Sequence, residues 1–396
     1  MLDKLEVKSG EGSIPFNRAC FQGKELVYIA RTIDNGHIMG DGPFSKKCEA
    51  FLENAVGVRK ALLTTSCTDA LEMAALLLDI KPGDEVILPS FNFVSGANAF
   101  VLRGARPVFA DIRRDTLNLN EHQLESLIGK RTRAILLVHY AGVACEMDTI
   151  MGIAAAHEIP VIEDNAHGLF GKYRGKALGS FGALATQSFH ETKNITSGEG
   201  GALLINDGRY LERAEIIREK GTNRSRFFRG QVDKYTWVDI GSSYLPSDMI
   251  AAFLFAQLEC AERIQKTRKY IWEHYHATLG DWAAASGVRL PVVPPECDQA
   301  YHMFYMLMPD LTSRQALIDH LKKQGIGAVF HYLPLHLSEM GSRFGGKPGD
   351  CPVTEDISDR LVRLPFYNEL SVEDLNRVIA AIKELKFGQQ PGSIAS

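Results

Sequence analysis

The chain has 396 residues, of which 45% are hydrophobic and 23% charged, the balance of a globular protein rather than a disordered or fibrous one. Its formal net charge of -4 gives no general reason to bind nucleic acid or an anionic membrane. Residues 1–13 carry both charge signs and lack the apolar core of a secretory signal, and no run of about 18 apolar residues follows. These features favour a cytoplasmic protein.

Seven cysteines are scattered along the chain without the short paired spacing of a zinc site. An odd number of cysteines in a large chain with an apolar core does not indicate a disulfide framework. We therefore expect reduced thiols and no metal site.

Short apolar runs alternate with helical patterns through the first two thirds of the chain. Strands are predicted at 61–65, 85–88, 107–110, 134–139, 160–163, 185–189 and 202–205. Helices are predicted at 68–79, 210–220 and 247–269, the last long enough to join two domains. The alternation predicts an α/β fold with a mostly parallel, seven-stranded sheet.

The pattern changes near Tyr270. The remaining segment is predicted to contain strands at 302–308 and 328–332 and helices at 313–324 and 372–385. We therefore expect an N-terminal extension (1–15), a large domain (16–269), a small α+β domain (270–387) and a disordered tail (388–396).

Two residues at predicted strand ends suit a pyridoxal phosphate site. Such a site needs a lysine that binds the cofactor, an acid opposite the ring nitrogen, an anion cradle and a flat partner for the ring. Asp164 follows the strand at 160–163, where the carboxyl ends of parallel strands share one crevice. Lys193 lies between a strand and a glycine-rich turn. A lysine buried beside a cationic ring has a lowered pKa, so it can both bind the cofactor and transfer a proton.

Other residues complete this predicted cofactor site. The segment Thr65-Ser-Cys-Thr-Asp-Ala-Leu71 follows a strand and opens a helix, whose free backbone N–H groups attract anions. We predict phosphate contacts from Ser66, Cys67, Thr68 and Ser188, ring stacking by Phe93 and contact with the ring's phenolic oxygen by His167. Each feature alone has a simpler explanation, such as a helix cap, a solvated lysine or a packed aromatic. Their joint order favours the cofactor site.

Three motifs resemble, in order and spacing, the DegT/DnrJ/EryC sugar aminotransferase family. They are Thr65 to Leu71, Glu163-Asp-Asn-Ala-His167 and Ser188 to Gly201, and Gly42-Pro-Phe44 also matches. The resemblance covers roughly residues 14–385. It implies a fold type I pyridoxal-phosphate-dependent nucleotide-sugar aminotransferase, and a homodimer whose shared active sites are completed by a loop of the partner subunit.

The family pattern also implies roles for residues outside the cofactor motifs. His331 and His336, in the matching segment His331-Tyr-Leu-Pro-Leu-His336, are expected near the substrate. Ser243 stands where many relatives carry an asparagine that contacts the phosphate across the subunit interface, and its hydroxyl is expected to replace that contact. A related dehydratase branch has histidine in place of Lys193, so the lysine favours transamination.

The segments 219–224, 232–237 and 241–248 resemble the dTDP-4-amino-4,6-dideoxygalactose transaminase branch of this family. That resemblance implies L-glutamate as amino donor and dTDP-4-dehydro-6-deoxy-D-glucose as acceptor, for bacterial surface polysaccharide such as lipopolysaccharide O-antigen or enterobacterial common antigen. Arg224 and Lys234, in a basic stretch with Lys220 and Arg229, suit the nucleotide diphosphate.

Two alternatives stay open. One is a C4 aminotransferase for another nucleotide keto sugar, such as UDP-4-keto-pentose, or one giving the gluco epimer. The other is a regulator that binds pyridoxal phosphate without turnover, which retention of Lys193 with Asp164 disfavours.

Overall fold

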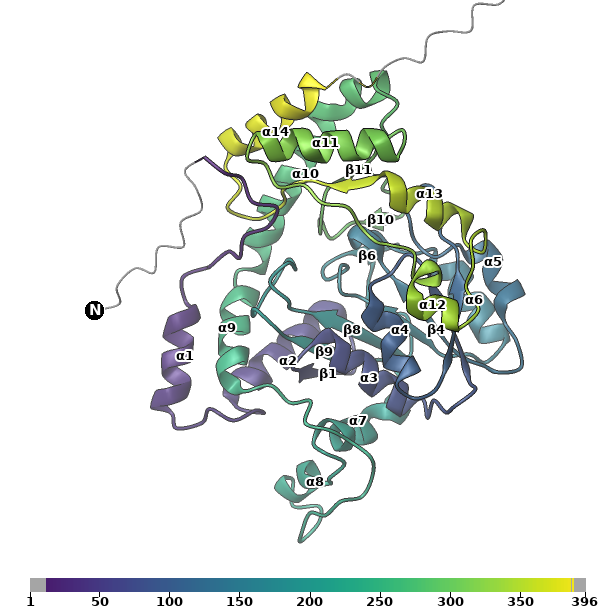
Figure 1. Ribbon diagram of the computed structural model, residues 1–396. Coiled ribbons are helices and arrows are strands. Elements are labelled where there is room, and N and C mark those ends of the chain that lie inside the picture. Colours follow the sequence, from purple (N-terminus) through teal and green to yellow (C-terminus); the bar gives the residue numbers. More distant parts are fainter. Residues whose placement is uncertain (1–11, 386, 388–396) are drawn as a thin grey trace, which may run out of the picture.

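The computed structural model describes residues 12–385 and 387, and its centre is a seven-stranded sheet (Figure 1). The strand order is β1-β9-β8-β5-β4-β2-β3. The bounds are β1 (Lys60–Thr64), β2 (Glu85–Pro89), β3 (Arg106–Ala110), β4 (Thr132–Val138), β5 (Val161–Asp164), β8 (Leu184–Ser188) and β9 (Gly201–Ile205). β9 is antiparallel to both of its neighbours, and the other six strands of this sheet run in one direction. The predicted mostly parallel sheet and its seven strands are confirmed.

Helices cover both faces of this sheet, because successive strand residues point to opposite sides. Leu62 packs with α3 (Cys67–Leu77), α4 (Val94–Val101) and α7 (Leu211–Arg218). Its neighbours Ala61 and Leu63 pack on the other side with α2 (Pro43–Val56) and α9 (Asp248–Leu258). That second face continues over β2 and β4 with α5 (Glu121–Leu127) and α6 (Met147–Ala156). The result is a three-layered, doubly wound α/β fold.

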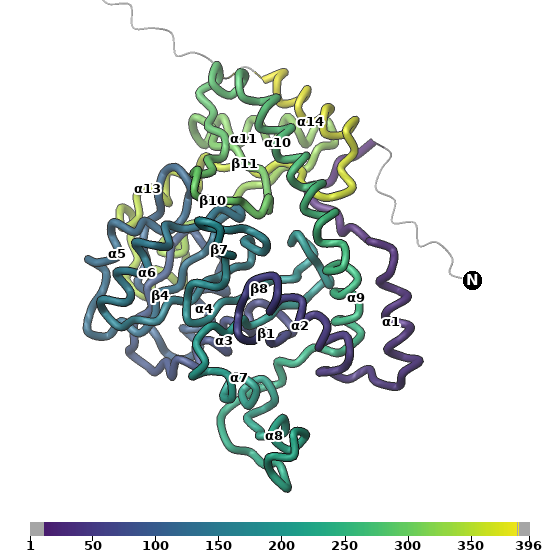
Figure 2. The backbone as a smooth tube through the Cα atoms, turned by 180° about the vertical axis from the view of Figure 1, so that it is seen from behind, coloured from purple at the N-terminus to yellow at the C-terminus, as the bar shows by residue number. Residues whose placement is uncertain are grey.

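The C-terminal elements have a hydrophobic cluster of their own, at the top of Figure 1 and also in the view from behind in Figure 2. Its residues come mainly from α10 (Ala261–Ala285), β11 (Tyr305–Leu307), α11 (Leu311–Lys323), β12 (Leu361–Arg363) and α14 (Val372–Glu384). Two further C-terminal helices, α12 (Glu339–Arg343) and α13 (Pro352–Arg360), contribute no residue to this cluster. Ile14, close to the described N-terminal end, belongs to this cluster and pairs with Ile326.

The remaining elements are peripheral. α1 (Glu25–Asp34) lies beside α9 in both views. β6 (Lys172–Tyr173), β7 (Lys176–Ala177) and β10 (Cys297–Asp298) form a small antiparallel sheet. Three short 3₁₀ turns occur at Tyr140–Gly142, Gly208–Tyr210 and Leu335–Leu337. α8 (Arg224–Phe228) lies in an arm, residues 219–243, that projects from the body at the bottom of Figure 1.

The long helix α10 crosses the predicted domain boundary. Its first residues Ala261 and Ile264 pack with the layer of α2 and α9, whereas Ile271 and Tyr275 pack in the C-terminal cluster. We therefore propose that the two domains meet within α10, near Tyr270. Residues 1–11 of the predicted extension and the predicted tail at 388–396 lie outside the described residues.

Two predictions of secondary structure are wrong. The predicted helix at 247–269 is two helices, because the chain turns at Cys260 (φ -104°, ψ 11°) between α9 and α10. The predicted strand at 328–332 is irregular: only Val329 pairs with Arg363, in an isolated bridge. None of the helices in the described residues is long and apolar enough to cross a lipid bilayer.

Candidate active site

A cavity of about 780 Å³ lies at the carboxyl ends of the central strands. Its wall includes residues at or just beyond the ends of β1, β4, β5 and β8. The predicted cofactor residues Ser66, Cys67, Thr68, Phe93, Asp164, His167, Ser188 and Lys193 all line it, as does His331. The structure therefore brings into one chamber residues that are far apart in the sequence.

The N-terminus of α3 opens into this cavity. Ser66 caps the helix, since its side-chain oxygen accepts a hydrogen bond from the Asp69 backbone N–H at 3.1 Å. Thr68 Oγ1 lies 2.9 Å from Ser95 Oγ, another residue of the cavity wall. The first backbone N–H groups of a helix have no acceptor within it, so this end of the cavity is suited to a phosphate.

Close approach of β9 to this loop requires glycine at position 201. Gly201 pairs with Thr64 on one side and Ser188 on the other. A Cβ added there would lie 2.4 Å from the backbone nitrogen of Cys67 and 2.4 Å from the carbonyl carbon of Ser66. The glycine-rich turn after Lys193 therefore lets three segments of the anion cradle meet.

Asp164 and Lys193 face the same cavity with opposite charges. Burial raises the pKa of Asp164, while the backbone N–H of Ala166, 3.1 Å from its Oδ1, and the charge of Lys193 oppose that shift. Burial also lowers the pKa of Lys193, and Asp164 partly offsets this change. A lysine amine whose charged form is disfavoured is a better nucleophile and proton acceptor near neutral pH.

Three histidines gather on one side of the cavity. His167 stacks on His302, with ring centroids 4.1 Å apart and planes at 14°. His331 lies 2.9 Å from the hydroxyl of Tyr140. Burial lowers the pKa of His167, His302 and His331 well below 6.5, so all three are neutral at physiological pH.

His167 retains an unused polar atom. Its Nδ1 is shielded from solvent and has no hydrogen-bond partner among the described residues. A buried polar atom without a partner is costly, and the side chain that carries this one lines the cavity, where a bound ligand would supply a partner. Together with the helix N-terminus, the acid and the lysine, this atom shows that the cavity fits pyridoxal phosphate.

Other predicted site residues lie at the rim or outside the cavity. Phe93 is at the rim with 56% of its surface exposed, and its ring centroid is 6.3 Å from that of Tyr332. His336 is fully buried outside the cavity wall, with Nδ1 2.6 Å from Ser90 Oγ and Nε2 3.0 Å from Glu355 Oε1. The ring of His336 therefore joins the end of β2 to α13, outside the cavity.

The residues predicted from the branch resemblance lie on or at the base of the projecting arm (Figure 1). Arg224 stacks on Phe228 and faces Glu219 at 4.0 Å, Lys234 is exposed, and Ser243 is exposed at the arm's base. None of the three lines the cavity of its own chain.

Several cavity residues were missed in the sequence. They include Phe16, Asn92, Ser95, His190, His302, Tyr332 and Arg363. A charged residue inside the apolar run Leu361-Val-Arg-Leu-Pro365 was a signal that could have identified Arg363. His302 carried no comparable signal, because only the fold brings it onto His167.

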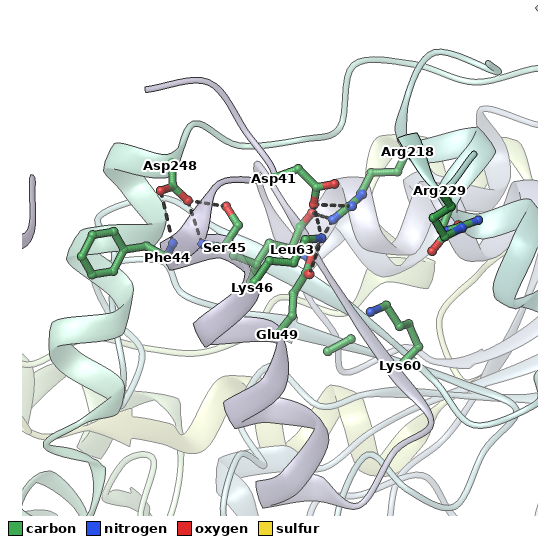
Figure 3. A network of polar contacts seen from close by, with 12 residues as sticks. Asp41, Phe44, Ser45, Lys46, Glu49, Lys60, Leu63, Arg218, Arg229 and Asp248 are labelled. Carbon is green, nitrogen blue, oxygen red and sulfur yellow. Dashed lines mark hydrogen bonds and ion pairs between the residues drawn. The ribbon is translucent and has the colours of Figure 1, made fainter. Parts of the chain in front are cut away.

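An ionic network with a buried centre supports the strand that leads to the anion cradle (Figure 3). Arg218 contacts Glu49 at 2.7 Å and Asp41 at 3.0 Å, and Lys46 contacts both carboxylates. Glu49 also accepts a hydrogen bond from the backbone N–H of Leu63 in β1. The network thereby ties α2 and α7 to the strand that ends at the cavity.

A second contact explains the Gly42-Pro-Phe44 motif. Asp248 at the start of α9 accepts hydrogen bonds from the backbone N–H groups of Phe44 (3.2 Å) and Ser45 (2.7 Å) at the start of α2 (Figure 3). A Cβ on Gly42 would lie 2.5 Å from the Asp248 carboxyl carbon. The motif therefore anchors α2 to α9 rather than lining the cavity.

Comparison with known proteins agrees with this geometry. Residues 20–383 match the model of the DegT/DnrJ/EryC1/StrS aminotransferase family. The chain is 30% identical to the spore coat polysaccharide biosynthesis protein SpsC of Bacillus subtilis, over 95% of this chain and 97% of SpsC. The aminotransferase TlmJ from Streptoalloteichus hindustanus superimposes with a TM-score of 0.86 at 29% identity, over 94% of this chain and 98% of TlmJ.

A further structural match is the PLP form of Spr1654 from Streptococcus pneumoniae. Its TM-score is 0.87 at 25% identity, over 94% of this chain and 98% of that chain. The family match extends over most of the sequence and agrees with a cavity that fits the cofactor. The chain therefore belongs to the DegT/DnrJ/EryC1/StrS aminotransferase family and is a pyridoxal-phosphate-dependent sugar aminotransferase.

Proposed function

We propose that the protein transfers the amino group of L-glutamate to C4 of dTDP-4-dehydro-6-deoxy-D-glucose. The products are dTDP-4-amino-4,6-dideoxy-D-galactose and 2-oxoglutarate, and the amino sugar enters bacterial surface polysaccharide. The observation that most strongly supports aminotransferase chemistry is that Lys193, Asp164 and the N-terminus of α3 all line one cavity. The resemblance of segments 219–224, 232–237 and 241–248 to one branch of the family supports the acceptor.

The roles of the residues follow from their positions. Pyridoxal phosphate, when bound, takes up the donor's amino group and acts as the electron sink that acidifies the donor Cα–H. The α3 N-terminus, Ser188 and the neighbouring hydroxyls hold the phosphate, and Asp164 holds the proton on the ring nitrogen. Lys193 binds the cofactor and its Nζ moves the proton from the donor Cα. His167 Nδ1, which lacks a partner among the described residues, supplies a hydrogen bond to the cofactor ring.

The arm supports a homodimer with shared active sites. Its exposed residues include Phe228 (68%), Tyr235 (51%) and Trp237 (79%), large apolar side chains of the kind that subunit interfaces cover. In the proposed dimer the arm carries Arg224, Lys234 and Ser243 to the partner's cavity, where the cations bind the nucleotide diphosphate. Mass measurement in solution should give twice the mass of the 43.8 kDa chain.

A direct product assay tests the proposed function. The purified protein would be incubated with pyridoxal phosphate, L-glutamate and dTDP-4-dehydro-6-deoxyglucose, and the sugar identified by mass and by the proton couplings at C4. An axial amine is the expected product. An equatorial amine would indicate an enzyme that gives the gluco epimer. Turnover only with UDP-4-keto-pentose would indicate that sugar as the acceptor, and either result would contradict the proposed function. Binding of the cofactor without conversion of glutamate would support the non-catalytic regulator.

A further inference from the structure

Arg363, which is partly buried, differs from the buried arginines in its lack of partners. Arg218 pairs with Glu49 and Asp41, and Arg268 donates to backbone carbonyl oxygens at 2.6 and 2.9 Å. Arg363, by contrast, has no hydrogen-bond acceptor and no carboxylate within 4.0 Å among the described residues, and its Nε is shielded from solvent. Arg363 is nonetheless one of the residues that line the active-site cavity.

The fold holds this side chain in place by other means. The backbone of Arg363 pairs with Tyr305 in β11 and with Val329, so its Cα is fixed on both sides. The guanidinium lies 4.7 Å from the ring centroid of Phe16, which also lines the cavity. The residue is therefore positioned without an anion of the same chain to balance it.

A cation without a counter-ion is costly even when it is only partly removed from water, as Arg363 is. Burial lowers the pKa of Arg363, because partial removal from water disfavours the charged form. A guanidinium nevertheless stays protonated at all physiological pH values. A buried charge is normally paired, because moving it out of water without a counter-ion costs several kcal/mol. The arrangement indicates that an anionic ligand supplies the missing partner.

The chemistry of the cavity favours a carboxylate as that anion. The cofactor phosphate already has the N-terminus of α3 at the other wall. Of the described residues that line the cavity, only Lys193 and Arg363 are strongly basic, and the three histidines are neutral. Lys193 would be occupied by the cofactor, which leaves Arg363 as the basic side chain of the wall that is available to a ligand. A guanidinium fits a carboxylate in two parallel hydrogen bonds.

We propose that Arg363 binds a carboxylate of the amino donor and so holds L-glutamate beside Lys193. This inference rests on the proposed function, from which it takes the donor. It assigns the donor site to the wall formed by β12, Phe16 and the histidines, and leaves the projecting arm for the nucleotide sugar. A donor without an acidic group would leave the guanidinium unpaired.

The test measures binding separately from turnover. Glutarate, which has two carboxylates and no amino group, would be titrated by calorimetry into the cofactor-loaded wild type, Arg363→Met, Arg363→Lys and the control Arg343→Met. Arg343 is exposed and pairs with Glu339 on the surface. We expect Arg363→Met to weaken glutarate binding by about 10- to 100-fold, Arg363→Lys to restore part of it, and Arg343→Met to match wild type. Arg363→Met should keep its melting temperature without ligand, because it removes a partly buried charge that has no partner among the described residues.

The two half-reactions then distinguish this inference from its alternatives. Arg363→Met should need more glutamate to reach half-maximal conversion, whereas the pyridoxamine phosphate form of the variant should react with the keto sugar as wild type does. Unchanged glutarate affinity would overturn the inference, and so would a loss confined to the keto sugar, which would assign Arg363 to the diphosphate. If the wild type bound glutarate through Arg363 but did not convert glutamate, the proposed donor would be wrong while the carboxylate site stood.

Discussion

Replacing Gly201 with alanine should weaken cofactor binding by crowding the anion cradle. The new Cβ would lie 2.4 Å from the Cys67 nitrogen and 2.4 Å from the Ser66 carbonyl carbon. Ordinary contacts of this kind are longer by about 1 Å, and such overpacking costs about 1–3 kcal/mol. Both neighbours are backbone atoms, so β9 and the N-terminus of α3 must move apart.

The expected loss of affinity follows from this displacement. A hydrogen bond to a charged group contributes about 1.5–3 kcal/mol, and about 1.4 kcal/mol corresponds to a factor of ten in a dissociation constant. Loss of one phosphate contact therefore predicts roughly 10- to 100-fold weaker binding of pyridoxal phosphate to Gly201→Ala. The assay is a titration of the apoprotein with the cofactor, followed by absorbance.

A matched glycine provides the control. Gly152 lies in α6, and a Cβ there would have no atom within 4 Å. Gly152→Ala should leave cofactor affinity unchanged and raise the free energy of unfolding by about 0.5–1 kcal/mol, because alanine favours the helix. Equal cofactor affinity in Gly201→Ala and wild type would refute the reasoning about the cradle.

Three further predictions concern Lys193 as the base, the ion pair between Glu49 and Arg218, and the neutral His302. Lys193→Ala should lower the rate of glutamate conversion by about 10³-fold or more, measured by the absorbance change of the cofactor, and a smaller loss would remove Lys193 as the base. Glu49→Gln should destabilise the fold by about 3 kcal/mol in urea unfolding, because Arg218 stays buried, whereas the exposed control Glu339→Gln should change stability by less than about 1 kcal/mol. The pKa of His302 is lowered from 6.5 in the folded state, so below pH 6.5 the unfolded chain binds a proton that the folded chain does not, and stability falls as the pH falls. His302→Asn should therefore reduce that slope by up to about 1.4 kcal/mol per pH unit between pH 5.5 and 7.5, and an identical slope would argue against a neutral His302.

The central sheet could be predicted because its strands are short apolar runs with helices between them. Lys193 and Asp164 were identified in the same way, since parallel strands place their carboxyl-terminal residues at one edge of the sheet. Both inferences depend on local pattern and on a general rule of α/β folds. Neither requires knowledge of which distant segments meet.

The other wall of the cavity could not be predicted by such reasoning. Arg363 and His302 come from segments beyond α10, and their position depends on how the C-terminal elements dock on the sheet. His331 and His336 lie five positions apart in one motif, yet only His331 lines the cavity, because the ring of His336 bonds to Ser90 and Glu355. Sequence spacing does not distinguish a histidine that faces a ligand from one that joins two buried segments.

Covalent trapping of the cofactor tests most directly whether this cavity is the active site. The cofactor-loaded protein would be reduced with borohydride and digested, and the modified lysine located by peptide mass spectrometry. A pyridoxyl group on Lys193, removed when the protein is first treated with L-glutamate, is the predicted result. A pyridoxyl group on another lysine, or none at all, would contradict the assignment of Lys193 and with it the chemistry assigned to the cavity.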